Sequence, residues 1–550
     1  TQVYGSLSAT GSLFLVNPNG VLFAPGSQVN VGGLLATTSQ ISDENFLNKN
    51  YQFHGDSTAS VVNQGVIRTT DGGFIVLLGE TVENVGSLIA DKGSVVLASA
   101  QNALLDMYGD GLVRIKLSGE ALNAAINNVG NIIADGGAVQ MAASARTAAI
   151  NVNGVVQANS LVSRNGVVRL ESGAKGTTLV NGKVSAQGLV AGTQGGSVEI
   201  TGDHVGLLAG ADVNVSGAAA GGSILIGGDY HGDNSAVQNA SRTYVADGAK
   251  INADAIETGD GGKVVVWADD ITRYYGSISS RGGAKSGNGG FVEVSGKRLL
   301  NFLGKVELGS AHGVGGSLLL DPNNITLSNG ADNNTTGFTA GTDNTEAFAD
   351  DASVDSVFNV QTGGSFAGVG NGRLITLQAS NNITIANNFD LATATGNSNV
   401  SLGLVANGNL NVNANLSATG SGTITLAANN SITVAAGKTV STTTGDLTVL
   451  ADYNNAFGGD LTLTGNVSST GGNILLQGAN INGGGNVTGA NAKNVEFTST
   501  IGGTYSGVVS GANANLVKTG AGTLTLLGAN TYTGATNVNV GTLKLGAANR

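Results

Sequence analysis

Apolar and polar residues alternate along most of this chain in short runs of four to six residues. Residues 94–98, Ser-Val-Val-Leu-Ala, are one such run, and glycine, asparagine and aspartate separate the runs from one another. Alternation with a period of two is typical of β-strands, and the separating residues are typical of turns. Only residues 121–127 have a spacing that also allows a helical stripe. The pattern therefore predicts an all-β protein.

A longer repeat groups these runs into units of about 20 to 25 residues. Its form is Asn-x-Gly-x-aliphatic, a polar link, Gly-Gly or Lys-Gly, and then alternating aliphatic residues. Copies begin at Asn63, Asn84, Asn128 and Asn181. Asn84 follows Asn63 by 21 residues, and Asn128 follows Asn84 by 44 residues, which we interpret as two units of 22.

A unit of this size cannot bury its own apolar face, so successive units must stack on one another. Strands that recur once per turn of a coil lie parallel, and their aliphatic side chains form interior ladders. Glycines at the corners adopt a positive φ without steric cost. A β-sandwich or barrel would show no constant period and more two-residue Asn-Gly hairpins. The repeat thus predicts a right-handed parallel β-helix, a solenoid in the form of an elongated rod.

The composition narrows the class of protein. Glycine accounts for 88 of 550 residues without a three-residue period and proline for only 3, which excludes collagen. With 41% hydrophobic and 11% charged residues, the chain does not have a disordered composition. The net charge is −12 and no basic run occurs, so no nucleic-acid partner is expected. The chain has no cysteine and no 18-residue apolar stretch, so we expect neither disulfides nor a transmembrane helix.

Few residues could support catalysis or metal binding. Asp269 with Asp270, and Asp350 with Asp351, are candidates for a polysaccharide-degrading enzyme, since parallel β-helices also host such enzymes. Neighbouring residues of a strand point to opposite faces, so the two carboxylates of such a pair would not share one catalytic site. Trp267 is expected to pack within a valine run rather than against a substrate. We therefore favour the interpretation that these carboxylates are solvated turn residues. The histidines lack metal-ligand spacing: His54, His204, His231 and His312. We predict no catalytic residue, no metal site and no cofactor.

One stretch near the start interrupts an apolar run with turn-forming residues. Residues 13–16 and 21–23 are apolar, and Asn17, Pro18, Asn19 and Gly20 separate them. Three of the four residues supply turn chemistry, and proline forbids a helix. The sequence therefore predicts a rigid turn between two hydrophobic strands.

Residues 2–38 resemble the secretion domain of the filamentous-haemagglutinin family, the exoproteins of bacterial two-partner secretion. Asn-Pro-Asn-Gly at 17–20, the Val-Leu-Phe that follows, and Val-Asn-Val-Gly-Gly-Leu-Leu-Ala-Thr-Thr at 29–38 carry the resemblance. Residues 242–297 and 315–327 also look like segments of large members of that family. Residues 516–545 are similar to the passenger-associated repeat of autotransporter β-helices.

The resemblance implies that Asn17, Pro18, Asn19 and Gly20 form the secretion-motif turn, which sets the register of the first coils. Pro18 presets φ, while Asn19 and Gly20 tolerate left-handed geometry. It also implies export through an outer-membrane two-partner secretion transporter, to the medium or the cell surface of a Gram-negative bacterium.

The function implied is that of an adhesin-like structural and binding rod. Its binding partner would be an unidentified receptor or glycan on a host or neighbouring cell. The alternative is a β-helical polysaccharide-degrading enzyme, either a lyase or a glycoside hydrolase.

We expect four segments along the chain. Residues 1–160 form a partial two-partner secretion domain, and residues 161–326 form a β-helix rod. Composition becomes rich in Asn and Thr beyond residue 321, so residues 327–514 form a second type of β-helix, with a surface excursion near 329–355. Residues 515–550 form the passenger-associated repeat. The chain has no leader after Thr1 and begins and ends within patterned sequence, so we expect a fragment of a longer protein.

Overall fold

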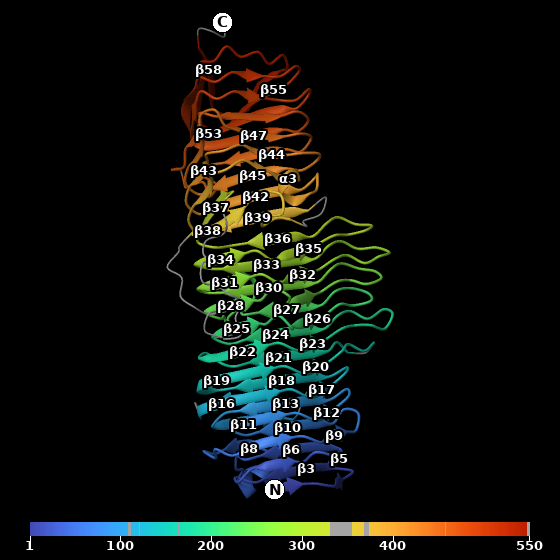
Figure 1. The fold of residues 1–550 in the computed structure, drawn as a ribbon. Coiled ribbons are helices and arrows are strands. Elements are labelled where there is room, and N and C mark those ends of the chain that lie inside the picture. Colours follow the sequence, from blue (N-terminus) through green and yellow to red (C-terminus); the bar gives the residue numbers. More distant parts are fainter. Residues whose placement is uncertain are drawn as a thin grey trace. The chain divides into compact units, whose positions relative to one another are not determined.

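The computed structural model describes residues 1–107, 112–119, 121–162, 164–329, 355–367, 373–456 and 458–546. Most of the described elements are strands, and these pair in long parallel ladders (Figure 1). The contacts divide the chain into two compact units. Unit 1 comprises Thr1–Glu293 and Ser310–Gly313, and unit 2 comprises Val294–Gly309 and the described residues from Val314 onward.

Unit 1 is built from coils that each add one strand to three parallel sheets. The first sheet contains β1 (Gln2–Val3), β4 (Val21–Phe23), β8 (Ser60–Asn63), β11 (Thr81–Asn84), β16 (Ala121–Asn128), β19 (Ala145–Val152), β22 (Gly176–Val180), β25 (His204–Leu207), β28 (Arg242–Val245) and β31 (Ile271–Tyr274). The second contains β2 (Ser6–Ser8), β5 (Gln28–Val31), β9 (Val66–Thr69), β12 (Ser87–Ile89), β17 (Asn131–Ile133), β20 (Val155–Gln157), β23 (Lys183–Ser185), β26 (Asp212–Asn214), β29 (Lys250–Asn252) and β32 (Ser277–Ser279). The third contains β3 (Ser12–Val16), β6 (Gly33–Thr37), β10 (Phe74–Leu78), β13 (Ser94–Ser99), β18 (Ala138–Ala143), β21 (Val167–Glu171), β24 (Ser197–Thr201), β27 (Ser223–Ile226) and β30 (Lys263–Ala268).

A few further elements lie outside these three sheets. They are α1 (Asp43–Leu47), β7 (Gln52–His54), β14 (Asn102–Asp106), β15 (Arg114–Ser118) and the short 3-10 helix η1 (Tyr230–Gly232). Strand β33 (Phe291–Gly296) contains the boundary between the two units, which lies between Glu293 and Val294.

Inward-facing aliphatic side chains of successive coils stack in register. In the third sheet, each member of one ladder pairs with the next and is at most 1% exposed: Leu34, Ile75, Val95 and Val139. The second sheet has an equivalent ladder of Ile67, Leu88 and Ile132. Each coil thus buries its apolar face against its neighbours, and the predicted parallel β-helix is confirmed.

The asparagine that opens each of three repeats is buried at the end of a first-sheet strand. Asn63, Asn84 and Asn128 are 0% exposed and pair in register. Nδ2 of Asn63 donates to Oδ1 of Asn84, and Nδ2 of Asn84 donates to Oδ1 of Asn128, both at 2.8 Å. Asn84 and Asn128 therefore lie on adjacent coils. Our interpretation of their 44-residue separation as two units of 22 is wrong.

Part of the sequence between Asn84 and Asn128 forms a small antiparallel sheet outside the coils. Strand β14 pairs on one side with β15 and on the other with β7, which comes from an earlier connection. Apolar side chains of this small sheet pack on outward-facing residues of the third sheet, in one cluster that includes Phe53, Val76, Val96, Leu105 and Ile115. The nearby residues 121–127, whose spacing also allowed a helix, lie in strand β16.

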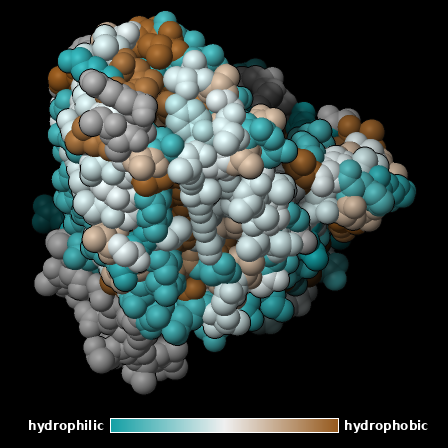
Figure 2. Space-filling view, turned by 90° about the horizontal axis from the view of Figure 1, so that it is seen from above, coloured by the Kyte–Doolittle hydropathy of each residue, from teal (hydrophilic) through white to brown (hydrophobic). Residues whose placement is uncertain are grey.

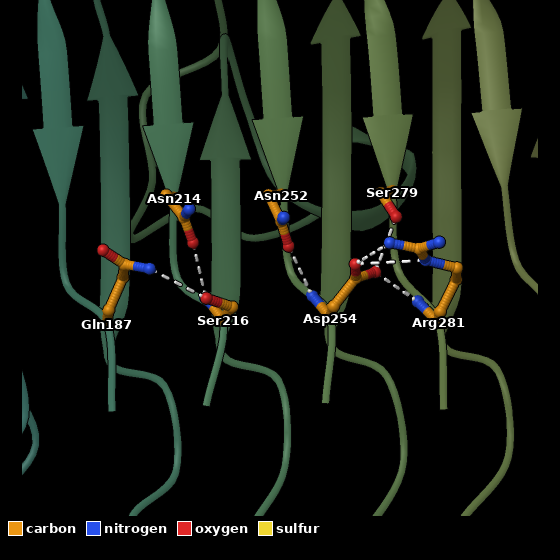
Figure 3. Close-up of polar contacts among 7 residues, drawn as sticks. All are labelled: Gln187, Asn214, Ser216, Asn252, Asp254, Ser279 and Arg281. Atoms are coloured by element: carbon orange, nitrogen blue, oxygen red, sulfur yellow. Dashed lines mark hydrogen bonds and ion pairs between the residues drawn. The ribbon is translucent and has the colours of Figure 1, made fainter. Parts of the chain in front are cut away.

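Polar side chains stack at the corner where the chain leaves the second sheet (Figure 3). The carboxylate of Asp254, 7% exposed, accepts hydrogen bonds from Oγ of Ser279 at 2.6 Å and from the amide of Arg281 at 2.7 Å. Nη2 of Arg281 adds an ion pair at 2.9 Å. Nearer the N-terminus, Nε2 of Gln187 donates to Oγ of Ser216 at 3.0 Å. These contacts join consecutive coils, so the corner residues hold the register together with the apolar ladders.

Unit 2 is also built from parallel strands. One ladder contains β36 (Ser317–Leu320), β39 (Leu374–Ala379), β42 (Ser401–Ala406), β45 (Ile424–Ala428), β48 (Leu447–Leu450), β51 (Ile474–Gly483), β53 (Asn494–Tyr505), β55 (Asn515–Thr519) and β57 (Thr536–Val538). A second contains β37 (Asn324–Ser328), β40 (Ile383–Ile385), β43 (Leu410–Val412), β46 (Ile432–Val434), β49 (Leu461–Leu463), the ends of β51 and β53, β56 (Thr523–Leu526) and β58 (Thr542–Leu545). A third contains β41 (Phe389–Asp390), β44 (Leu416–Ala418), β47 (Thr439–Thr442), β50 (Asn466–Ser469), β52 (Val487–Thr488) and β54 (Val509–Ser510). The remaining elements are β34 (Leu299–Phe302), β35 (Lys305–Glu307), β38 (Asp355–Asn359) and α3 (Leu391–Thr395).

Asparagine side chains link the coils of unit 2 at its corners. Oδ1 of Asn382 accepts the amide of Asn409 at 2.8 Å, and Oδ1 of Asn466 accepts the amide of Asn486 at 2.8 Å. This use of asparagine accounts for part of the compositional shift beyond residue 321. The surface excursion expected near 329–355 lies outside the described residues, apart from its two end positions.

The face of the molecule that Figure 2 shows is mostly polar or neutral. Figure 2, which looks down from above the C-terminal end in Figure 1, shows hydrophilic and intermediate residues with apolar residues in small separate groups. Among the described residues, no helix is long and apolar enough to cross a membrane.

Candidate functional site

The predicted turn joins the third sheet of the first coil to the first sheet of the second coil. Strand β3 ends at Val16 and β4 begins at Val21, and the two strands belong to different sheets. The amide of Gly20 donates to the carbonyl oxygen of Asn17 at 3.0 Å, and the amide of Asn19 donates to Oδ1 of Asn17 at 3.0 Å. The residues therefore form a β-turn that the side chain of its first residue reinforces.

Asn19 and Gly20 both tolerate left-handed backbone geometry, but only Gly20 adopts it. Its φ is 101°, whereas Asn19 does not have a positive φ. A Cβ atom on Gly20 would also lie 3.2 Å from the carbonyl oxygen of Ser60. Asparagine first, proline second and glycine fourth are the residues that a type I turn favours.

Contacts from other segments hold the turn in place. The amide of Asn17 donates to the carbonyl oxygen of Thr37 at 2.9 Å, and Nδ2 of Asn17 donates to Oγ1 of Thr1 at 2.9 Å. Oγ of Ser57 donates to the carbonyl oxygen of Pro18 at 2.5 Å. Pro18 and Asn19 themselves are exposed. The turn is thus anchored at its base and presents its two central residues to solvent.

Two hollows adjoin residues 55–59, an irregular segment between β7 and β8 that we call the 55–59 segment. The larger has a volume of about 450 Å³ and the smaller about 220 Å³. Both are lined by Thr38, Gly55, Asp56, Ser57 and Thr58. The larger is also lined by Pro18, Asn19, Gln40 and Ala59. The smaller is also lined by Ser39, Glu80, Ala100, Gln101 and Ala121. The motif turn is therefore one wall of the larger hollow.

The 55–59 segment is not apparent from the amino-acid sequence. Its contact with the turn joins Ser57 to Pro18, 39 residues apart, and no periodicity predicts such a pair. The only sequence signal is the loss of alternation between the strands on either side of it.

The carboxylates considered for catalysis lie at a corner and have different partners. Asp269 and Asp270 lie between β30 and β31. Oδ1 of Asp269 accepts from Nε1 of Trp267 at 3.0 Å, and Oδ2 of Asp270 lies 3.5 Å from Nε of Arg242. Trp267 is 3% exposed, which agrees with the packing role expected for it. The other pair, Asp350 and Asp351, lies outside the described residues.

The histidines take part in local contacts. Nδ1 of His54 lies 3.1 Å from the carbonyl oxygen of Gln40, and the amide of His231 donates to the carboxylate of Glu293 at 3.3 Å. Burial lowers the pKa of His204, whose Nε2 lies 3.9 Å from Oδ2 of Asp203. Within the described ranges, no group of three or more His, Asp or Glu side chains could hold a metal ion.

The last strands contain a buried lysine. Lys518 in β55 is 0% exposed, and its Nζ donates to the carbonyl oxygens of Gly520 at 2.8 Å and Val540 at 3.4 Å. Burial lowers the pKa of this amine. The contact with Val540 joins adjacent coils, so Lys518 fixes the corner between them.

Comparison with known proteins identifies two segments. Residues 1–200 match the TPS secretion domain, and residues 516–545 match the passenger-associated-transport-repeat. A heme/hemopexin-binding protein of Haemophilus influenzae (strain ATCC 51907 / DSM 11121 / KW20 / Rd) is 32% identical over 136 residues, which cover 23% of this chain and 15% of that protein. A second heme/hemopexin-binding protein of Haemophilus influenzae is 43% identical over 53 residues, or 10% of this chain and 6% of that protein. The chain thus spans less than a fifth of the length of these curated relatives.

A solved structure is also similar. It is the crystal structure of the HMW1 secretion domain from Haemophilus influenzae, with 32% sequence identity and a TM-score of 0.47. The alignment covers 53% of this chain and 76% of that chain.

The two family matches fall on the two ends of the chain where the sequence showed the resemblance. The secretion-domain match contains the motif turn and the 55–59 segment, and the repeat match contains β56 to β58. The expected location, secreted or at the cell surface of a Gram-negative bacterium, is likewise confirmed. The chain belongs to the two-partner secretion exoproteins and carries a passenger-associated repeat near its C-terminal end.

Proposed function

We propose that this chain is an adhesin-like binding scaffold exported through an outer-membrane two-partner secretion transporter. The observation that carries the export step is the anchored Asn17–Gly20 turn within the segment that matches the secretion domain. The binding partner proposed is a receptor or glycan on a host or neighbouring cell. Parallel coils support this role because each corner displays side chains without interrupting the interior ladders.

The names of the curated relatives favour binding over catalysis. Both are named as heme/hemopexin-binding proteins, and this name describes a binding function. In our proposal the present chain also binds a partner, whose identity the names of relatives do not assign.

The proposal gives the motif turn two roles. Because Pro18 presets φ and Gly20 allows the left-handed exit, Asn17–Gly20 fixes the register between the first and second coils. Because Pro18 and Asn19 are exposed, the same turn is available to the transporter. We propose residues 1–160 as the partial secretion domain, 161–326 and 327–514 as β-helix, and 515–550 as the passenger-associated repeat.

An export assay tests the motif turn. The natural full-length chain carrying Asn17→Ala and Asn19→Ala is produced in cells with its transporter, and the protein in the medium is measured. We expect secretion to fall, since Asn17 loses the side-chain bonds to the amide of Asn19 and to Thr1. The control is Asn407→Ala with Asn429→Ala, a second pair of coil-linking asparagines, which is expected to leave export unchanged. Normal export of the first variant would reduce the motif to an ordinary turn.

A further inference from the structure

We propose that a groove on unit 1 binds an extended, uncharged glycan chain. The groove has a volume of about 510 Å³ and is lined by glycine pairs at 195–196, 221–222 and 261–262, so we call it the glycine groove. The inference rests on the proposed function, and it names the binding site and the chemical class of the ligand.

The glycine groove runs along the stack of coils. It is lined by the first residues of four successive third-sheet strands, Ser197 of β24, Ser223 of β27, Lys263 of β30 and Phe291 of β33 (Figure 1). The last three each donate a backbone amide to a glycine of the coil before, at 3.0 to 3.1 Å, so the lining residues are in register. Coils stack at about 4.8 Å, which is close to the length of one sugar unit in an extended chain. The groove therefore presents similar groups at the spacing of successive sugars.

Hydrogen-bonding groups along the groove are not used within the chain. The hydroxyls of Ser197 and Ser223 are on half-buried residues and bond to no other described group. The carbonyl oxygens of Gly221 and Gly261 likewise accept no hydrogen bond from the described residues. A hydroxyl donates and accepts, and a carbonyl oxygen accepts, so together these groups can bond to the hydroxyls of a sugar.

An aromatic pair lies at the Phe291 end of the groove. The ring of Tyr230, in η1, packs on the ring of Phe291 with the ring centres 5.7 Å apart, and Tyr230 is 45% exposed. The amide of the next residue, His231, donates to the buried carboxylate of Glu293 at 3.3 Å, which fastens η1 to the third sheet. Tyr230 is thus held in place before a ligand binds, and its ring offers an apolar face to the C–H groups of a sugar.

The charge of the groove disfavours an acidic ligand. Lys263 is the one charged residue among those that line it. Its Nζ pairs with Oδ1 of Asp229 at 2.5 Å, so its charge is compensated. Nucleic acids and acidic polysaccharides are bound through several uncompensated cations, which this groove does not have. An uncharged chain fits the lining better.

The backbone of the groove disfavours a peptide that adds as a strand. The amides of Gly195, Gly221 and Gly261 donate to carbonyl oxygens of the neighbouring coil at 2.9 to 3.0 Å. Strand addition needs a free sheet edge with unpaired amides. The glycine groove crosses several paired strands instead of following one edge, so its geometry favours a glycan over a peptide.

The aromatic ring provides the first test. Cellohexaose, chitohexaose and mannohexaose are titrated into the purified natural full-length chain, and binding is measured by calorimetry. We expect at least one of them to bind, and Tyr230→Ala to weaken that binding at least tenfold because the stacking face is lost. The matched control is Tyr453→Ala, which removes a 51% exposed tyrosine of unit 2 and should leave the affinity unchanged.

The hydroxyls provide a second test. Ser197→Ala with Ser223→Ala removes both hydroxyls, and we expect the affinity to fall about tenfold. Ser197→Thr with Ser223→Thr keeps both hydroxyls in strand positions that suit threonine and should bind normally. Thermal unfolding of each purified chain shows whether its fold is retained, and the tyrosine pair still decides the question if a serine variant is misfolded.

The length of the ligand provides a third test. Because four successive coils line the groove, we expect affinity to rise from the disaccharide to a chain of about four sugars and then to level off. Equal affinity for the disaccharide and the hexaose would contradict a site that extends along the coils.

The outcomes separate the inference from the proposed function. The tyrosine and both serine positions except Ser197 lie beyond the secretion-domain match, which ends at residue 200, so export can be measured independently of binding. A chain that is exported and adheres to cells but binds no neutral hexaose, or that prefers heparin, would overturn the inference and leave the proposed function standing. A chain that is exported but neither adheres to cells nor binds any of these sugars would overturn both.

Competition identifies the source of the glycan. Adhesion of the purified chain to host cells and to bacterial cells is measured with and without the soluble hexaose that binds best. Inhibition on either surface supports the inference and shows which surface carries the glycan. Adhesion that the hexaose does not reduce on either surface would mean that the glycine groove is not the adhesive site, and the inference would be wrong.

Discussion

Asn84 is a polar side chain within an aliphatic core, and its neighbours explain why it is tolerated there. Its Oδ1 accepts from Asn63, and its Nδ2 donates to Asn128, so both ends of the amide are bonded. Buried polar groups are stable only when they are bonded in this way. The repeat in the sequence located Asn84 but not its burial, because its partners are 21 and 44 residues away.

Replacing Asn84 with leucine should destabilise unit 1. The change leaves Oδ1 of Asn128 without the donor that bonds it, in a site that water does not reach. An orphaned buried polar group costs about 1–3 kcal/mol, and we expect the free energy of unfolding to fall by about that amount. Chemical denaturation followed by circular dichroism measures the loss.

The matched control for this variant is Asn127→Ala. Asn127 is an outward-facing, half-buried residue of β16, and its Oδ1 accepts from Nδ2 of Asn151. Because solvent can replace this bond, we expect a loss below about 0.5 kcal/mol. An equal loss in both variants would show that the buried ladder has no special role.

At the scale of the elements, the third sheet shows what the sequence pattern could and could not predict. Residues 74–78 read Phe-Ile-Val-Leu-Leu, a continuous apolar run rather than an alternating one, and all five are buried. Such a run is typical of a strand covered on both faces. The parallel strands followed from the repeat, whereas the covering sheet of β7, β14 and β15 did not, because its strands come from two separate insertions.

Removing one aromatic side chain should detach this covering sheet locally. Phe53 in β7 is 0% exposed and packs in the apolar cluster beneath the sheet. Phe53→Ala should cost about 3–5 kcal/mol at this site. Because the ladders of the three main sheets are retained, we expect faster hydrogen exchange in β14 and β15 and unchanged exchange from β19 to β31.

The control for this variant is a side chain of β14 that does not belong to the cluster. Leu104 is 44% exposed, so Leu104→Ala should leave the exchange of β14 and β15 nearly unchanged. Exchange that rises equally throughout unit 1 in the Phe53 variant would mean that the covering sheet and the coils unfold together.

At the scale of the whole molecule, the class of fold was predictable because stacking is a nearest-neighbour arrangement. Each repeat pairs only with the coils before and after it. The same contact between neighbouring coils therefore recurs along the chain, and a short period in the sequence is enough to predict it. Sites formed by long-range contacts are different. The bond from Ser57 to Pro18 and the hollows beside it depend on one particular insertion, and the period carries no information about that insertion.

A binding scaffold should lack polysaccharide-degrading activity, and this separates the two functional classes considered for the chain. Glycoside hydrolysis requires two carboxylates about 5–9.5 Å apart, flanking the bond that is cleaved. Asp269 accepts from the indole of Trp267, and Asp270 pairs with Arg242, so each carboxylate of this corner is already engaged. We therefore expect the purified chain to release no new reducing ends and no unsaturated products from pectin, alginate, chitin or glucan. A known lyase and a known hydrolase serve as positive controls in the same assay. Activity that disappears in Asp269→Ala or Asp270→Ala would instead assign catalysis to this corner, and the chain would then be an enzyme as well as an exoprotein.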